Sequence, residues 1–188
     1  MTIRSAALVI SPSRAEAVAA AKELAPLLYS AGFSLYTISD VSIEGIKKVA
    51  PADLPEIEIA VVLGGDGTIL RAAELVREQN TPILGINLGH VGFLAEVEKL
   101  TNSEILKAII EKNYKTEDRM ILGYKVLRGE KEISSGWALN EVTIERNDHQ
   151  MIEVFAQIDH RPLSRWGCDA VICATPTGST AYALSAGG

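Results

Sequence analysis

The sequence is poor in the residues that build disulfides and metal sites. It has two cysteines, Cys168 and Cys173, and three scattered histidines among its 188 residues. This pattern makes no disulfide framework and has no metal-ligand spacing, so we expect no metal site built by protein side chains. Such cysteines are typical of small packing residues in a reducing compartment, and we expect a cytoplasmic location.

A basic surplus and long apolar runs are also missing. The formal net charge of −6 argues against a general nucleic-acid binder, which needs clustered Lys and Arg. The longest apolar stretches have the length of strands, and the N-terminus does not read as a signal peptide, so we expect no membrane span. The length suits one large domain or two small ones.

The first hundred residues alternate between apolar strand patterns and helical patterns. This alternation predicts an α/β domain over residues 1–100, with a Rossmann-like parallel sheet and ligands at the carboxyl ends of its strands. A capping-box pattern at Ser13–Glu16 predicts a helix ending near Gly32, which Pro26 should kink or split. A short helix is expected within 40–55 and another helix over 68–79. The expected strands are 6–11, 34–39, the run before Gly64, and 82–88.

The pattern becomes β-rich after residue 100. A second capping box at Thr101–Glu104 predicts a helix to about residue 112, and the domain boundary falls within 98–116. Residues 101–188 are expected to form a sandwich-like β domain. The chain stops just after a helix begins, which predicts that this domain is incomplete. The expected strands are 119–128, 132–146, 151–159 and 169–176.

The turn Gly64-Gly65-Asp66-Gly67-Thr68 is the most informative segment. It follows an apolar strand and precedes a helix, and its glycines allow a ligand to approach the backbone closely. The N–H groups of such a turn favour phosphate, whereas a carboxylate there needs a proton, a metal or a sugar hydroxyl as its partner. The turn is neither a P-loop nor a dinucleotide fingerprint. An ordinary tight turn, with Asp66 or Thr68 as helix cap, is the alternative.

Two later segments combine polar side chains with apolar strands. Asn140-Glu141 lies within the apolar run WALNEVTI and is either a bulge or strand-end pair or a hydrogen-bonding pair for an amide or ribose. The stretch from Thr175 to Tyr182 is either an ordinary strand–turn–helix junction or a site whose small residues admit a planar group, on which Tyr182 stacks. Asp169 is a lone carboxylate before an apolar run, able to accept hydrogen bonds from a base or carboxamide.

Two further residues are candidates near the first turn. Arg71 lies one helical turn past Thr68, where it either offsets phosphate charge or is simply solvated. Phe93 lies in a second glycine-containing loop, with His90, and is either a base-stacking platform or part of the core.

Together these segments resemble the NAD kinase family. The runs LGGDGTILRAAEL, ILGINLGHVGFLAEVE, ALNEVTIER and CDAVICATPTGSTAYALSAGG occur in the family's order and spacing. Phosphofructokinases and diacylglycerol and sphingoid lipid kinases share GGDG, whereas the Asn-Glu and TPTGSTAY segments make the resemblance specific.

The resemblance implies a phosphoryl transfer from ATP or polyphosphate, with Mg²⁺, to the adenosine ribose 2′-hydroxyl of NAD, giving NADP. It implies that Asp66 activates that hydroxyl and that the protein is a homo-oligomer, a dimer or a tetramer. The residues implied to bind nucleotide are Gly65, Gly67, Arg71, Phe93, Asn140, Glu141, Asp169, Thr180, Ala181, Tyr182, Ala183, Leu184 and Ser185.

Two alternatives stay open. One is a lipid or sugar kinase of the same GGDG superfamily, although no segment demands an acyl tunnel. The other is a fragment that binds dinucleotide without turnover.

Overall fold

The structure is a computed structural model that describes residues 4–86 and 101–188. It divides into two compact units, Met1–Glu117 and Asp118–Gly188. The first unit extends past residue 100 because helix α3 (Asn102–Glu111) packs against helix α1 (Ala15–Ser30).

A five-stranded sheet forms the centre of the first unit. Every pairing in it is parallel, and the strand order is β3-β2-β1-β4-β5. The α/β fold class and the parallel sheet are thereby confirmed. The strands are β1 (Arg4–Ile10), β2 (Phe33–Thr37), β3 (Ile46–Lys48), β4 (Ile59–Leu63) and β5 (Ile83–Ile86).

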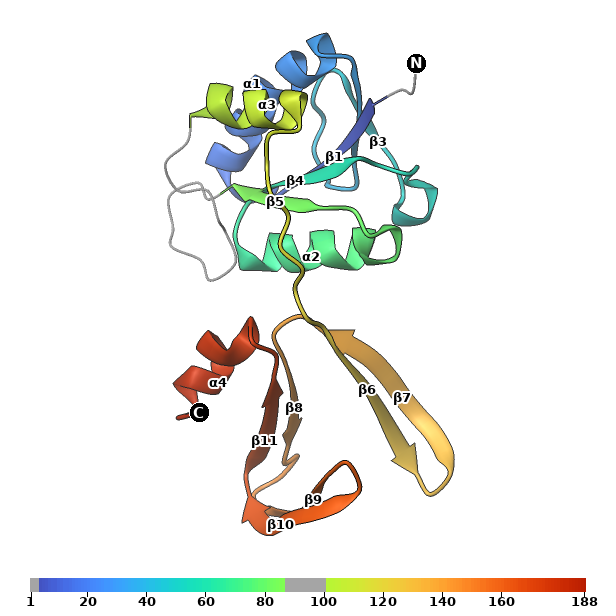
Figure 1. The fold of residues 1–188 in the computed structure, drawn as a ribbon, viewed down its shortest axis with the longest axis vertical. Coiled ribbons are helices and arrows are strands. Elements are labelled where there is room, and N and C mark those ends of the chain that lie inside the picture. Colours follow the sequence, from blue (N-terminus) through green and yellow to red (C-terminus); the bar gives the residue numbers. More distant parts are fainter. Residues whose placement is uncertain (1–3, 87–100) are drawn as a thin grey trace. The chain divides into compact units, whose positions relative to one another are not determined.

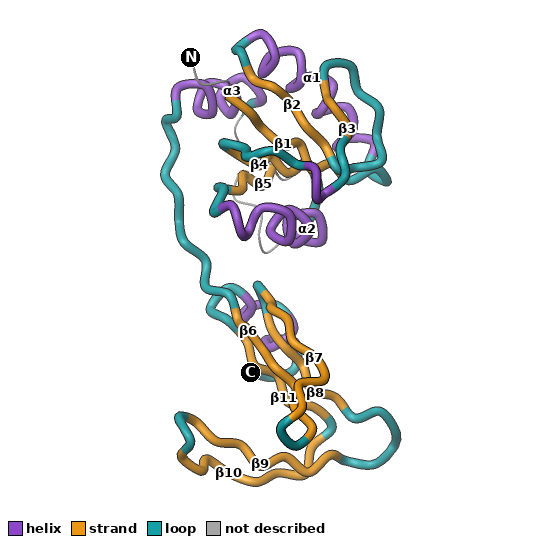
Figure 2. The backbone as a smooth tube through the Cα atoms, turned by 90° about the vertical axis from the view of Figure 1, so that its right-hand side faces the viewer, coloured by secondary structure: helices purple, strands orange, loops and turns teal. Residues whose placement is uncertain are grey.

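Helices cover both faces of this sheet. Figures 1 and 2 show α1 and α3 on one side and α2 (Asp66–Val76) on the other. Strand β1 packs against the helices on both faces of the sheet. Leu8 belongs to the apolar cluster with α1 and α3, whereas Val9 packs with Ile69 of α2. A strand buried on two faces reads as a continuous apolar run, which explains the sequence of β1 and β4.

The predicted helix starts have different outcomes. At α3, Thr101 and Glu104 form the expected capping box, with the Glu104 N–H donating to the Thr101 hydroxyl. At α1, the N-cap is Arg14, which makes no side-chain capping hydrogen bond, so the predicted box at Ser13 is wrong. Helix α1 also continues through Pro26 and is not split.

Residues 40–55 contain a strand in addition to the short helix that the sequence indicates. They contain β3, which extends the sheet beside β2, and a 3₁₀ helix over Pro51–Asp53. The strand forms because parallel pairing to β2 outweighs the polar, mixed composition of this stretch.

The second unit is β-rich and consists of antiparallel pairs. Strand β6 (Leu122–Arg128) pairs with β7 (Lys131–Ala138), and β8 (Glu141–Glu145) pairs with β11 (Ala170–Ala174). Strand β9 (Ile152–Ile158) pairs with β10 (Arg161–Cys168). A 3₁₀ turn, η3 (Gly178–Thr180), and helix α4 (Tyr182–Ser185) follow β11.

This unit differs from the sequence predictions in two places. The expected single strand over 132–146 divides at Leu139 and Asn140, because β7 pairs with β6 and β8 pairs with β11. Strand β10 was not predicted. It forms through a two-residue turn in which Asp159 and His160 have φ of 50° and 63°, the signs that a type I′ hairpin requires.

An ion cluster connects three parts of the first unit. The Arg4 guanidinium donates to both carboxylate oxygens of Glu58, and it donates to the carbonyls of Ile109 and Ile110 at 2.9 and 2.7 Å. The Lys112 ammonium lies 3.4 Å from Glu58. The hydrogen bond from Arg4 holds the pKa of the Glu58 carboxyl below its ordinary value, against the opposing effect of burial. This cluster fixes the end of α3 to the sheet.

We predict that Glu58→Gln lowers the free energy of unfolding of the first unit by about 1–3 kcal/mol at neutral pH, the cost of losing a charge-assisted hydrogen bond. A carboxyl group whose pKa is lower in the folded state than in the unfolded state stabilises the folded state at pH values above the unfolded-state pKa. The difference between the two proteins should therefore shrink as the pH falls below 4.5, the ordinary pKa of the carboxyl.

Urea denaturation followed by far-UV circular dichroism measures this, since helices α1, α2 and α3 all belong to the first unit. Asp40→Asn is the control, because the Asp40–Lys48 pair is exposed and its loss should leave the unfolding midpoint unchanged. A difference between Glu58→Gln and the unsubstituted chain that stays constant from pH 7 to pH 3 would contradict the assignment.

Candidate functional site

The glycine turn joins β4 directly to α2. Strand β4 ends at Leu63, Gly65 is the N-cap, and the half-buried Asp66 is the first residue of the helix. The Gly65 carbonyl accepts hydrogen bonds from the N–H groups of Thr68 and Ile69 at 2.8 and 3.2 Å. The capping residue is thus a glycine without a side-chain cap, rather than Asp66 or Thr68 as in the ordinary-turn alternative.

The glycines of this turn have different physical roles. A Cβ at Gly64 would lie 2.3 Å from Thr68 Oγ1, so the Thr68 side chain occupies the space that a larger residue would need. Gly67 is exposed, and a Cβ there would meet nothing within 4 Å. Arg71 is exposed four residues later, which places both on one face of α2. This face leaves the turn exposed at Gly67.

The turn lies at the carboxyl edge of the sheet, beside the end of β1. The Ser11 N–H donates to the Leu63 carbonyl at 2.9 Å, which carries the β1–β4 pairing one step past the strands. Arg14 in the following loop places its guanidinium against Gly65. Arg14 was not predicted from the sequence, because its relevance follows only from the adjacency of β1 and β4.

A second group of predicted residues meets at one end of the β8–β11 ladder. The Thr175 N–H donates to the Asn140 carbonyl at 2.8 Å, and the Thr175 hydroxyl donates to the Leu139 carbonyl at 2.5 Å and accepts from the Gly178 N–H at 3.1 Å. A Cβ at Gly178 would lie 2.0 Å from the Asn140 carbonyl oxygen, so the close approach requires glycine. The Asn-Glu and TPTG segments therefore form one junction.

Two oxygens of this junction are buried and unpaired. Asn140 Oδ1 and Glu141 Oε2 are shielded from solvent, and neither has a hydrogen-bond partner among the described residues. Buried polar atoms are almost always hydrogen-bonded, so exceptions need an explanation such as a ligand. Both belong to residues that the sequence predicted to bind a nucleotide.

The remaining predicted residues are more dispersed. Asp169 lies at the opposite end of the β8–β11 ladder from Asn140 and pairs with Arg146 at 3.3 Å. The structure thus does not bring Asp169 next to Asn140 and Glu141. Phe93 lies outside the described residues. Six consecutive predicted residues lie at the end of η3, in the link between η3 and α4, and in α4: Thr180, Ala181, Tyr182, Ala183, Leu184 and Ser185.

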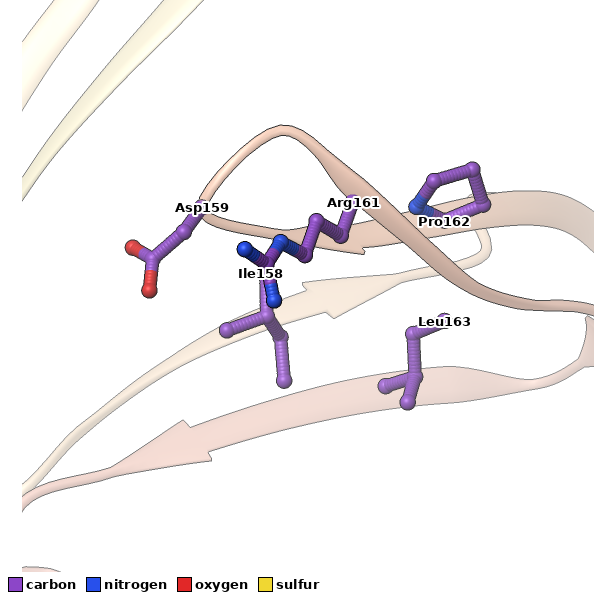
Figure 3. Close-up of a pocket in the computed structure, with 5 residues that line it drawn as sticks. All are labelled: Ile158, Asp159, Arg161, Pro162 and Leu163. Atoms are coloured by element: carbon purple, nitrogen blue, oxygen red, sulfur yellow. The ribbon is translucent and has the colours of Figure 1, made fainter.

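A hollow of about 410 Å³ lies elsewhere, at the β9–β10 turn. Figure 3 shows the Ile158 and Leu163 side chains on the same side of the hairpin, with the Asp159 carboxylate pointing away from them. Arg161 and Pro162 complete the lining. The hairpin connects the Glu145 and Ala170 ends of the ladder, so this hollow is not part of the Asn140 junction.

Family models match two separate parts of the chain. The ATP-NAD kinase N-terminal domain matches residues 46–114, and the ATP-NAD kinase C-terminal domain matches residues 139–188. The chain belongs to the NAD kinase family. The first match contains the glycine turn, and the second contains both segments of the Asn140 junction.

Individual relatives agree with this family. The NAD kinase of Thermobifida fusca (strain YX) is 43% identical, over 100% of this chain and 62% of its own length. The NAD kinase of Corynebacterium glutamicum is 54% identical, over 70% of this chain and 46% of its own length. A crystal structure of yeast NADH kinase complexed with NADH is 25% identical, with a TM-score of 0.86 over 99% of this chain and 61% of that one. The chain therefore spans about three fifths of the T. fusca enzyme.

In the part of the chain that the structure describes, none of the helices has both the length and the apolar character needed to cross a bilayer.

We predict different effects on stability for substitutions at two residues of the junction. Thr175→Val leaves the buried Leu139 carbonyl and Gly178 N–H without partners and should lower the free energy of unfolding of the second unit by about 1–3 kcal/mol. Glu141→Gln removes a charge whose buried oxygen has no protein partner in the described structure, and it should leave that free energy unchanged or raise it.

Tryptophan fluorescence during urea denaturation isolates this unit, because Trp137 and Trp166 are the two tryptophans of the sequence and both lie in it. If Glu141→Gln lowers the free energy of unfolding more than Thr175→Val does, the Glu141 carboxylate stabilises the fold and the prediction is wrong.

Proposed function

We propose that this chain carries the acceptor-activating and dinucleotide-binding residues of an NAD kinase. In the proposed reaction, the adenosine ribose 2′-oxygen of NAD bonds to the terminal phosphorus of ATP or polyphosphate. The bond from that phosphorus to its bridging oxygen breaks, and the hydroxyl proton passes to the Asp66 carboxylate. The products are NADP and ADP or a shortened polyphosphate.

The position of Asp66 is the observation that carries this proposal. Its carboxylate is the first side chain of α2, beside the exposed Gly67 and at a helix N-terminus, which favours phosphate. A ribose hydroxyl is a weak nucleophile, and a carboxylate within hydrogen-bond reach accelerates its attack by general-base catalysis. The remaining acceleration comes from alignment and charge neutralisation, which dominate phosphoryl transfer.

Asn140 and Glu141 are the proposed anchors for the dinucleotide. Their unpaired oxygens are acceptors, and the ribose hydroxyls and the adenine amine are donors, so a bound dinucleotide would supply the missing hydrogen bonds. Tyr182 is 46% exposed and offers a ring for stacking. The NADH bound to the yeast relative supports this ligand class. Roles for Asp169 and Phe93 rest on the family resemblance alone.

The family resemblance also implies Mg²⁺ with the phosphoryl donor. Among the described residues, no three His, Cys, Asp or Glu side chains are grouped to hold a metal ion. Mg²⁺ usually keeps several waters and binds substrate phosphates, so the ion would enter the site with the donor and leave the Asp66 carboxylate as the base. When bound, the ion would neutralise charge on the transferred group.

We also propose an assembly and a cellular location. A homodimer or homotetramer in the cytoplasm follows from the family resemblance. The second unit exposes large apolar side chains, among them Phe155 and Trp166 at 55% and 40%, which is typical of a surface that another chain segment or subunit covers.

The direct test is NADP formation by the full-length protein that carries residues 1–188. Asp66→Asn should lower kcat by roughly 10²-fold or more, the scale of a general-base contribution, because the amide cannot take the proton. Calorimetry should find NAD binding within a few-fold of the unsubstituted protein, since the proposed anchors are in the other unit.

Glu74→Gln is the matched control, because Glu74 is an exposed carboxylate on the same helix. Parallel assays with ATP or polyphosphate as donor, and NAD, NADH or a diacylglycerol as acceptor, identify the substrates. A near-normal kcat for Asp66→Asn would remove Asp66 from the chemistry. NAD binding without NADP formation would contradict the kinase activity and support a protein that only binds the dinucleotide.

A further inference from the structure

Arg14 lies directly against the glycine turn, although it is far from it in sequence. Its Nη2, Cζ and Nη1 atoms lie 3.1, 3.5 and 3.6 Å from the position that a Cβ at Gly65 would take. The guanidinium therefore lies over the glycine, in space that any larger side chain would fill. The absence of a side chain at residue 65 is what lets the cation approach the turn.

No structural role accounts for this cation. Within residues 4–86 and 101–188, the Arg14 guanidinium makes no ion pair and donates no hydrogen bond, although the side chain is half-buried. Arg4 in the same unit, by contrast, makes four hydrogen bonds. Arg14 is also the N-cap of α1 without serving as a side-chain cap. A partly desolvated charge is costly unless something pairs with it.

The place of Arg14 in the sheet indicates what that partner is. In the order β3-β2-β1-β4-β5, strands β2 and β3 lie on one side of β1, and the later strands β4 and β5 lie on its other side. The direction in which strands are added to the sheet therefore reverses between β1 and β4. Ligands of such sheets bind at this point, outside the carboxyl ends of the strands. Arg14 follows β1 and Gly65 follows β4, so both lie at this point of the sheet edge.

We propose that Arg14 binds the phosphate chain of the phosphoryl donor, an inference that rests on the proposed function. A guanidinium presents planar paired N–H donors that match two oxygens of one phosphate. Arg14 lies over Gly65, and Arg71 lies on the exposed face of α2 with Gly67. These two arginines balance the negative charge that the donor brings to a turn already carrying Asp66. The donor is preferred over NAD as the partner because its terminal phosphates carry more charge than the diphosphate of NAD.

The first test is steady-state kinetics on the full-length protein with Arg14→Gln. The KM for the donor should rise about 10- to 100-fold, as expected for loss of a charge-assisted contact, while the KM for NAD stays within two-fold. Arg14→Lys should recover part of the loss, since it keeps the charge without the paired donors. Lys22→Gln is the control, because it removes the same charge from an exposed position on α1. Far-UV circular dichroism checks that each variant folds.

The second test does not depend on turnover. Calorimetry with inorganic tripolyphosphate should show about ten-fold or greater weakening in Arg14→Gln and no change in Lys22→Gln. If the unsubstituted protein forms no NADP but Arg14→Gln weakens tripolyphosphate binding, the proposed function fails and the phosphate contact stands. The inference is overturned if donor KM and tripolyphosphate affinity are both unchanged, or if only NAD affinity falls.

Discussion

The parallel pairing of β1 with β4 is the constraint on which the candidate site depends. Both strands are buried on two faces, and their register, with Ile10 opposite Leu63, is continued by the Ser11 N–H bonded to the Leu63 carbonyl. A slip of one residue would exchange the side chains packed against α1 with those packed against α2. The register thus fixes where both strands end, and it brings the Arg14 loop to the turn that holds Asp66.

The β8–β11 ladder plays the corresponding part in the second unit. It joins Asn140 to Thr175, and the hydroxyl of Thr175 then bonds both to Leu139 and to Gly178. The hydroxyl and backbone groups of this junction thereby hold the chain, while Asn140 Oδ1 and Glu141 Oε2 have no hydrogen-bond partner among the described residues. A backbone fixed in this way lets side chains stay in position without hydrogen bonds of their own, which favours preorganised binding.

The sequence was most informative where one local rule decides the structure. The β4–turn–α2 segment and the Thr101 capping box follow from nearest neighbours, and both were predicted. Prediction failed where distant pairing decides. Strands β3 and β10 form on partners that local composition does not reveal, and the strand over 132–146 divides because its halves pair with different strands. Arg14 was missed for the same reason, since only the strand order places it at the glycine turn.

The proposed function requires the Asp66 carboxylate to lie against the adenosine ribose of the bound dinucleotide. A crystal structure of the full-length protein with NAD measures it directly. We expect an Asp66 carboxylate oxygen within hydrogen-bond distance of the adenosine ribose 2′-oxygen, about 2.5–3.2 Å. NAD bound with that oxygen near other groups, and with the carboxylate turned away from it, would contradict the account.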